Sequence, residues 1–206
     1  MQNRLGIPFY NYGHKILLSI TIITLLIILI HTSNNTPEAL GFFFNDQKAP
    51  MLTYENNEFK FKISYPDNWE RSVKINNEIT FVSPKDKDSV SSPGGLIIKV
   101  VPLQSKNVSL GPVSNALISQ LKKEHKDFKL ESSQNSAVGG KNAKKIIFTA
   151  TDNRLQERKA LQIITINNNN IFIITYKASL NKYSTYESTI NDMISSFKFT
   201  TATTTK

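Results

Sequence analysis

The segment QERKALQIITINNNNIFIITYK, residues 156–177, decides the fold of this chain. It contains two almost continuously apolar stretches, residues 160–166 and 171–177, which the polar run 167–170 joins. Short apolar stretches on either side of a tight polar turn are typical of strands buried on both faces. Because a tight turn makes neighbouring strands antiparallel, the segment predicts the buried centre of an antiparallel sheet.

Shorter apolar stretches outside this segment indicate further strands. Residues 59–65, FKFKISY, alternate strictly between apolar and polar side chains, which is typical of a strand with one face buried. Pro66, the pair Asn76-Asn77 and the pair Gly139-Gly140 favour turns between strands. The expected strands are 59–65, 69–74, 78–83, 95–101, 129–138, 143–152, 156–167 and 171–177.

Two amphipathic helices interrupt this series of strands. The first begins near Gly111-Pro112, where the missing N–H of proline costs little, and has apolar side chains at spacings of three and four. The second is indicated by residues 184–187, a capping box in which Ser184 is the N-cap. Helices on both sides of one sheet give an α+β fold, an α/β/α sandwich with a central antiparallel sheet.

The composition excludes several classes of protein. The 206 residues include no cysteine, which excludes a disulfide scaffold, a thiolate zinc site and a cysteine nucleophile. With 39% hydrophobic and 20% charged residues, the chain is too apolar for a mostly disordered protein. The net charge of +9 bears on solubility and nonspecific association and does not specify a fold or an activity.

A stretch near the N-terminus predicts a membrane segment. Residues 16–30, ILLSITIITLLIILI, contain no charged side chain, whereas Arg4 and Lys15 precede them. The length also suits a signal-peptide core, but no small-x-small cleavage pattern follows closely, which favours an uncleaved signal anchor over 15–31. Because basic flanks stay in the cytoplasm, we expect the rest of the chain to be extracytoplasmic. A buried core helix is the alternative, although an all-round apolar helix suits lipid better.

Four further segments surround the expected anchor. They are a cytoplasmic N-terminus (1–14), a polar linker (32–51), a folded domain (52–199) and a disordered Thr-rich tail (200–206). The expected location is therefore the cell membrane, with one transmembrane helix and an exported C-terminal domain.

Several short motifs occur in a fixed order along the folded domain. Y-P-x-x-W follows an F-x-F strand, F-V-S-P follows a later strand, S-L-G-P opens the first helix, and S-F follows the second. Their residues include Tyr65, Pro66, Trp69, Pro84, Gly111, Ser196 and Phe197. Over residues 53–199 this order resembles the PsbP family, the extrinsic subunit of the oxygen-evolving complex of photosystem II and its relatives.

The resemblance implies an antiparallel sheet between helices and a non-catalytic accessory or binding module. PsbP proteins of photosystem II reside in the thylakoid lumen and help to retain calcium and chloride. The expected signal anchor, without a transit peptide, departs from that pattern. Relatives of the fold also occur in bacteria and archaea outside photosynthesis, so the resemblance implies no particular partner.

A catalytic site would need a nucleophile, a base and an orienting group. His125 is the single histidine of the folded domain and lies among lysines in the sequence KKEHKDF. A solvent-facing histidine near the negative end of a helix dipole explains this position as well as a catalytic base does. We therefore expect no enzyme, and a hydrolase that uses His125 is the less favoured alternative.

Candidate metal ligands are few. Asp86 and Asp88, and Asp152 at a turn, could supply oxygen atoms to a hard cation such as calcium. Calcium usually takes about six to eight oxygen ligands, however, and Lys85 and Lys87 alternate with the first two aspartates. This alternation favours a solvated charge run, so we expect no cofactor, with calcium as the alternative.

Two other signals carry little weight. The lysines are scattered and form no stripe with interleaved aromatic residues, so the sequence does not indicate nucleic-acid binding. Asn34 and Asn107 each begin a glycosylation sequon, which matters only in a host that glycosylates exported proteins.

The sequence thus predicts a membrane-anchored, extracytoplasmic PsbP-like domain that acts as a non-catalytic binding or assembly module. Its expected partners are the membrane and a membrane or envelope protein. The alternative is a carrier of a small ligand or of calcium, with a cleft between the sheet and a helix.

Overall fold

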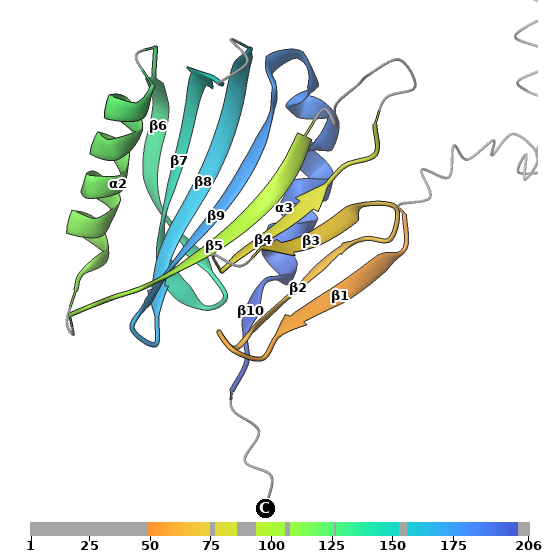
Figure 1. Ribbon diagram of the computed structural model, residues 1–206, viewed down its shortest axis with the longest axis horizontal. Helices are drawn as coiled ribbons and strands as arrows, with labels where there is room; N and C mark the ends of the chain where they lie inside the picture. The colour runs from red at the N-terminus through yellow and green to blue at the C-terminus, as the bar shows by residue number, and fades with distance from the viewer. Residues whose placement is uncertain are drawn as a thin grey trace, which may run out of the picture. The chain divides into compact units, whose positions relative to one another are not determined.

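The structure is a computed structural model that describes residues 49–74, 77–85, 94–105, 108–125, 127–152 and 156–201 (Figure 1). The expected cytoplasmic segment and anchor, and the linker up to residue 48, lie outside the described residues, as does the tail from residue 202. In the described part of the chain, no helix is both long enough and apolar enough to cross a membrane.

Seven antiparallel strands form the larger sheet, in the order β3-β4-β5-β9-β8-β7-β6. Strands β8 and β9 come from the segment 156–177 and each has a neighbour on both sides, which confirms their central place. Asn168 and Asn169 have φ angles of 48° and 60°, as a two-residue hairpin turn requires. The strands are β3 (Glu70–Lys74), β4 (Glu78–Val82), β5 (Gly94–Pro102), β6 (Lys129–Val138), β7 (Lys141–Thr151), β8 (Glu157–Asn167) and β9 (Asn170–Ser179).

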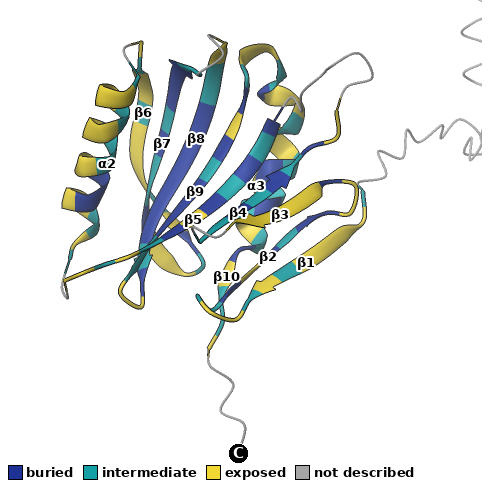
Figure 2. Cartoon of the chain, viewed as in Figure 1, coloured by how far each residue is buried: buried dark blue, intermediate teal, exposed yellow. Residues whose placement is uncertain are grey.

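A second, three-stranded antiparallel sheet has the order β1-β2-β10. It consists of β1 (Met51–Asn56), β2 (Phe61–Pro66) and β10 (Lys198–Phe199). The prediction of one sheet was therefore wrong, because the alternating segment 59–65 forms β2 outside the larger sheet. Strand β1 was not predicted, since most of its side chains are exposed and give no apolar period (Figure 2).

Two α-helices accompany the sheets: α2 (Leu110–Glu124) and α3 (Glu187–Ser196). Helix α2 begins beside Gly111 as predicted, but the capping box at Ser184 was wrong. Residues Ser184–Tyr186 form a 3-10 turn that follows another at Leu180–Lys182, and α3 begins after them with no side-chain cap. Tertiary packing explains why this segment does not begin a regular helix. The Tyr176 hydroxyl donates a hydrogen bond to the Tyr183 carbonyl (2.6 Å) and so holds Tyr183 in the core.

The two helices cover opposite faces of the larger sheet. Along β8, Leu161 and Ile163 belong to a large hydrophobic cluster that includes strand β2 and Met193 of α3. Ala160 belongs to a smaller cluster, against which Leu121 of α2 packs. The expected α+β fold with antiparallel sheet structure is thus present. The second sheet packs on the same face of the larger sheet as α3.

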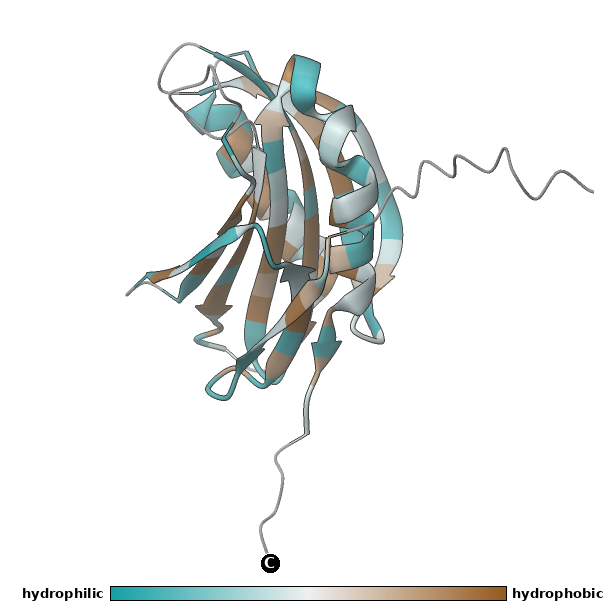
Figure 3. Ribbon diagram, turned by 90° about the vertical axis from the view of Figure 1, so that its right-hand side faces the viewer, coloured by the Kyte–Doolittle hydropathy of each residue, from teal (hydrophilic) through white to brown (hydrophobic). Residues whose placement is uncertain are grey.

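The described domain contains its own hydrophobic core. Both clusters and all strand pairs are formed within residues 51–199, and hydrophobic residues concentrate along the strands (Figure 3). The single tryptophan, Trp69, is 5% exposed in this core, so its fluorescence can report on folding.

Candidate binding groove

Helix α2 covers only part of its face of the larger sheet. It contacts strands β7 and β8, and a groove remains between the helix and the open faces of β4, β5 and β9. We call this groove, of about 460 Å³, the α2 groove. Two smaller hollows, of about 160 and 210 Å³, share Lys177 with it. These hollows extend the surface that a bound molecule can contact.

The strand register explains which side chains meet in the α2 groove. Residues opposite one another in a sheet project to the same face. One such row contains Thr80, Ile97, Thr175 and Gln162, on β4, β5, β9 and β8. The rows on either side bring Lys99 opposite Ile173 and Lys177 opposite Ala160. The sheet thus places polar and basic groups on a partly apolar floor.

Two polar atoms of the central row are buried and unsatisfied. Gln162 is 9% exposed, and its Nε2 donates a hydrogen bond to Thr175 Oγ1 (3.1 Å). Its Oε1 accepts no hydrogen bond from any described residue, and Thr80 Oγ1 is also without a described partner. A buried acceptor without a donor costs about 1–3 kcal/mol. This cost is a reason to expect a bound group at Gln162.

The charged groups around the groove differ in whether they have a described ion-pair or hydrogen-bond partner. Lys99 and Lys177 form no ion pair with any described residue, and both are exposed. By contrast, the Glu78 carboxylate is 2.8 Å from Lys74 Nζ, and the Glu124 carboxylate accepts a hydrogen bond from Gln120 (2.7 Å). The groove therefore presents the cations of Lys99 and Lys177, while the charge of Glu78 is compensated by Lys74 and Glu124 has only the neutral Gln120 as its described partner.

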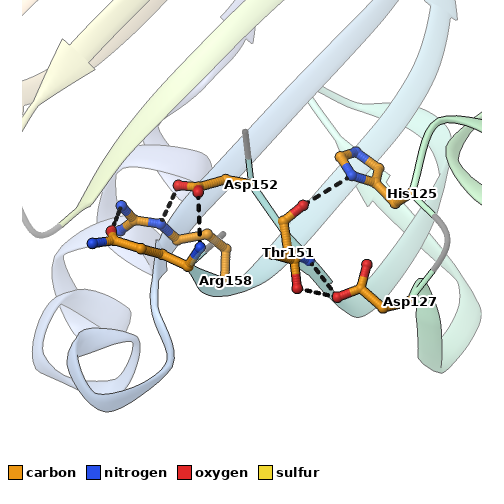
Figure 4. A network of polar contacts seen from close by, with 6 residues as sticks. His125, Asp127, Thr151, Asp152 and Arg158 are labelled. Atoms are coloured by element: carbon orange, nitrogen blue, oxygen red, sulfur yellow. Dashed lines mark hydrogen bonds and ion pairs between the residues drawn. The ribbon is translucent and has the colours of Figure 1, made fainter. Parts of the chain in front are cut away.

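A polar network holds the end of α2 against the sheet (Figure 4). His125 Nδ1 lies 3.2 Å from the Thr151 carbonyl, and because a carbonyl only accepts, this nitrogen is the donor. Asp127 accepts hydrogen bonds from the Thr151 backbone N–H (2.9 Å) and from its hydroxyl. The Thr151 hydroxyl lowers the pKa of the Asp127 carboxyl below its usual value. Next to them, Arg158 Nε forms an ion pair with Asp152 (2.9 Å).

The network gives His125 and Asp152 structural contacts. The described contact of the His125 ring is a backbone carbonyl, and the Thr151 hydroxyl next to it donates to Asp127. Asp152, a candidate calcium ligand in the sequence, is engaged by Arg158 and also accepts from the Gln156 backbone N–H (3.1 Å). Within the described ranges, no group of three histidine or acidic side chains is placed to hold a metal ion.

Most of the motif residues lie in or against the core on the other face of the sheet. Trp69 packs edge-on against Tyr186 of the turn before α3 (5.5 Å between ring centroids), and Tyr65 packs against Phe81 (4.8 Å). Phe197 stacks on Phe61 (5.3 Å). These side chains therefore stabilise the fold and do not line the groove.

The remaining motif residues are near the ends of elements. Pro66 is buried at the end of β2, whereas Pro84 and Gly111 are exposed. Ser196 Oγ accepts from the Ser64 backbone N–H (2.8 Å) and donates to the Met193 carbonyl (2.6 Å), which ties α3 to β2. Four other predicted residues lie outside the described residues, namely Asp86, Asp88, Asn34 and Asn107.

The residues that line the groove were not predicted from the sequence. The signal that it could have used is the presence of single polar residues within apolar strands, such as Gln162 in ALQIITI and Lys99 in GLIIKVV. A polar residue on a face that its neighbours bury needs a partner, and this makes it a candidate for binding.

These features define an α+β domain with two antiparallel sheets and an open groove walled by a helix. The chain belongs to the PsbP-like protein family, whose sequence model matches residues 16–199. The resemblance drawn from the short motifs is thereby confirmed. No curated protein matches the chain.

Several solved structures share the fold at low sequence identity. Cyanobacterial PsbP (CyanoP) from Synechocystis sp. PCC 6803 has a TM-score of 0.56 at 14% identity, over 73% of this chain and 93% of that one. The Ran-binding protein Mog1p of Saccharomyces cerevisiae has a TM-score of 0.52 at 8% identity, over 73% and 96%. PA94 of Pseudomonas aeruginosa, a protein of unknown function described as a putative regulator, has a TM-score of 0.53 at 12% identity, over 70% and 94%.

Proposed function

We propose that this protein is a membrane-anchored, extracytoplasmic and non-catalytic binding module of a membrane or envelope complex. The α2 groove is the observation that carries the proposal, because it combines an apolar floor, available lysines and the unsatisfied Gln162 Oε1. Membership of the PsbP-like family supports it. Mog1p, named as a Ran-binding protein, is an example of a binding role on this fold, which we use as an analogy.

The apolar run at residues 16–30 motivates the membrane part of the proposal. Alkaline washing of membranes from cells that make the full chain tests the anchor, and protease treatment of intact cells tests the location. We expect the chain to stay with the washed membranes and the domain to be digested from outside. Quantitative release by alkali would contradict the anchor, and full protection of the domain would contradict its export.

The binding role is tested by the size of the assembly that contains the chain. On blue native gels of gently solubilised membranes, we expect the full chain to migrate as part of a larger complex. Val101→Asp, which places a charge in the α2 groove, should release it. Val73→Asp is the matched control, because Val73 is 59% exposed on edge strand β3, outside the groove lining. Equal migration of both variants with the wild type would contradict binding through the groove.

A carrier of a small ligand or of calcium is the second candidate. The volume of the groove, about 460 Å³, favours the small-ligand form, since pockets for small ligands span about 300–1,000 Å³. Calorimetric titration of the full chain with Ca²⁺ tests the calcium form. Heat that disappears in an Asp86→Asn, Asp88→Asn double variant would support it, and a titration without heat would remove it.

A further inference from the structure

A hollow of about 160 Å³ adjoins the α2 groove at the C-terminal end of helix α2. We call it the α2-end hollow. Its apolar lining consists of Leu121 from the helix, Phe148 and Ala150 from β7, and Ala160 from β8. The two alanines fill little space beneath the end of the helix, which explains why the sheet and the helix leave a hollow at this point.

The α2-end hollow has room for one six-membered ring. An engineered apolar cavity of about 150 Å³ holds one benzene molecule, and the hollow has nearly the same volume. Pockets that take a whole small ligand span about 300–1,000 Å³. Leu121, Gln162 and Lys177 line both the hollow and the α2 groove, so the two spaces are continuous. The hollow is therefore suited to one side chain of a segment that lies in the groove.

A buried acceptor in the lining requires a hydrogen-bond donor. Gln162 is 9% exposed, and its Oε1 accepts no hydrogen bond from any described residue. Its Nε2 already donates to Thr175 Oγ1 (3.1 Å), so the amide is held in place by one end. A side chain that fills the hollow should therefore combine an apolar ring with a donor.

The charged groups at this end of the groove balance one another. Arg158 forms an ion pair with Asp152 (2.9 Å) in the lining of the hollow. Lys177 is the other cation of the lining, and the carboxylate of Glu124 lies at the end of the same helix. A charged side chain would gain little from this balanced surrounding and would lose its hydration. The hollow therefore favours an uncharged side chain.

Tyrosine is the side chain that meets these conditions. Phenylalanine has no donor, tryptophan adds a second ring, and histidine would bury a second polar nitrogen. Lysine and arginine carry a charge, and serine and threonine have no ring. Tyrosine joins one apolar ring to a hydroxyl that usually finds a partner when it is buried, and it is enriched among the anchors of protein interfaces.

We propose that the α2 groove binds a protein segment that inserts a tyrosine side chain into the α2-end hollow. The ring lies against Leu121 and Ala160, and the hydroxyl donates to Gln162 Oε1. The rest of the segment lies in the groove, against Leu117 and Ile173. The inference rests on the proposed binding function, because it names the part of the partner that the groove recognises.

Nuclear magnetic resonance of the full chain in nanodiscs tests the chemistry of the hollow. The probes are N-acetyltyrosinamide and N-acetylphenylalaninamide, which differ by one hydroxyl, and the methyl signals of Ala150 and Ala160 report binding. The tyrosine probe should bind about fivefold more tightly, the usual net effect of one hydrogen bond. In Gln162→Met this preference should disappear. Gln134→Met, at an exposed site on edge strand β6, is the matched control and should keep it.

A crosslinker at the rim of the groove tests the partner itself. Gln120 is exposed on α2 and lines the groove, so Gln120→p-benzoylphenylalanine should crosslink the bound segment in membranes. We expect the crosslinked peptide of the partner to contain a tyrosine. Its replacement by phenylalanine should weaken the complex about fivefold on blue native gels of diluted samples, as should Gln162→Met. Both changes together should weaken it no further, because they remove the same hydrogen bond.

Three results would overturn the tyrosine anchor: no response of Ala150 and Ala160 to the tyrosine probe, equal affinity for the two probes, or a crosslinked peptide without tyrosine. A preference that persists in Gln162→Met while circular dichroism shows a folded domain would also overturn it. If Val101→Asp still releases the chain from its complex, the proposed function stands without this anchor. If the chain forms no complex, the proposed function fails as well.

Discussion

Replacing the buried Gln162 by methionine should stabilise the domain in the absence of ligand. The two side chains have a similar linear shape, so the substitution removes the polar amide with little change in packing. If Gln162 is kept for binding, its unsatisfied Oε1 destabilises the free protein, and its removal should be favourable.

The magnitude follows from the contacts of the amide. Removal of the buried, unpaired Oε1 should recover about 1–3 kcal/mol. Loss of the hydrogen bond from Nε2 to Thr175 Oγ1 should cost about 0.5–1.5 kcal/mol. The net expectation is a gain of about 1 kcal/mol in the free energy of unfolding. For a domain of this size, that gain raises Tm by about 2–4 °C.

Urea unfolding of the fragment 49–206, followed by Trp69 fluorescence, measures the change. Thr165→Val on the same strand is the matched control, because the Thr165 hydroxyl is buried and donates to the Asn142 carbonyl (2.8 Å). This variant should lose about 1 kcal/mol. A loss of 1 kcal/mol or more for Gln162→Met would refute the reasoning, since it would make Gln162 a structural residue whose hydrogen bonds are satisfied.

Three further predictions concern the core and the strands. Burial raises the pKa of Tyr183 to about 12 and also raises that of Tyr176, so both hydroxyls stay protonated in the folded state at pH values where the unfolded chain ionises. The contribution of these two tyrosines to the unfolding free energy should therefore be constant below about pH 10. It should fall between pH 10 and 12, by up to about 1.4 kcal/mol per pH unit for each tyrosine, and a flat profile in this range would contradict the prediction. Gly95→Ala should lower the free energy of unfolding by about 1–3 kcal/mol, because the added Cβ would lie 2.7 Å from the Phe81 carbonyl oxygen. Gly111→Ala should be neutral or stabilising, because the added Cβ would meet no non-neighbouring atom within 4 Å. Equal stabilities of the two variants would be inconsistent with the described packing. Trp69→Ala should lose about 3–5 kcal/mol, measured by circular dichroism, and a loss below 1 kcal/mol would show that the packing on Tyr186 is not part of the core.

The sequence predicted the larger sheet well where the apolar pattern is a direct result of burial. The segment 156–177 forms β8 and β9 because almost every residue of these strands packs on one face or the other. The first helix was equally clear, since one side of α2 packs on the sheet. Strand β1 was missed for the opposite reason, because only Tyr54 and Asn56 are half-buried in it.

Two features depend on contacts between distant residues, which a local pattern does not contain. Ser184 has the sequence of an N-cap, but the packing of Tyr183 on Tyr176 (4.8 Å between ring centroids) holds the preceding segment in short turns. The α2 groove depends on how far the helix covers the sheet. Lys99 is more than 60 residues away from Gln162 and Lys177 in the sequence. Only the strand register brings the three side chains to one face of the sheet.

The most direct test of the central claim, that the α2 groove is the binding site, is side-chain footprinting by a carbene reagent. The labelling of the full chain in native membranes is compared with that of the purified chain. We expect protection of Leu117, Leu121 and Ile173 in the membranes, with Val73 on the exposed edge strand labelled equally in both samples. Full labelling of the groove residues in membranes, with protection at Val73 instead, would contradict it.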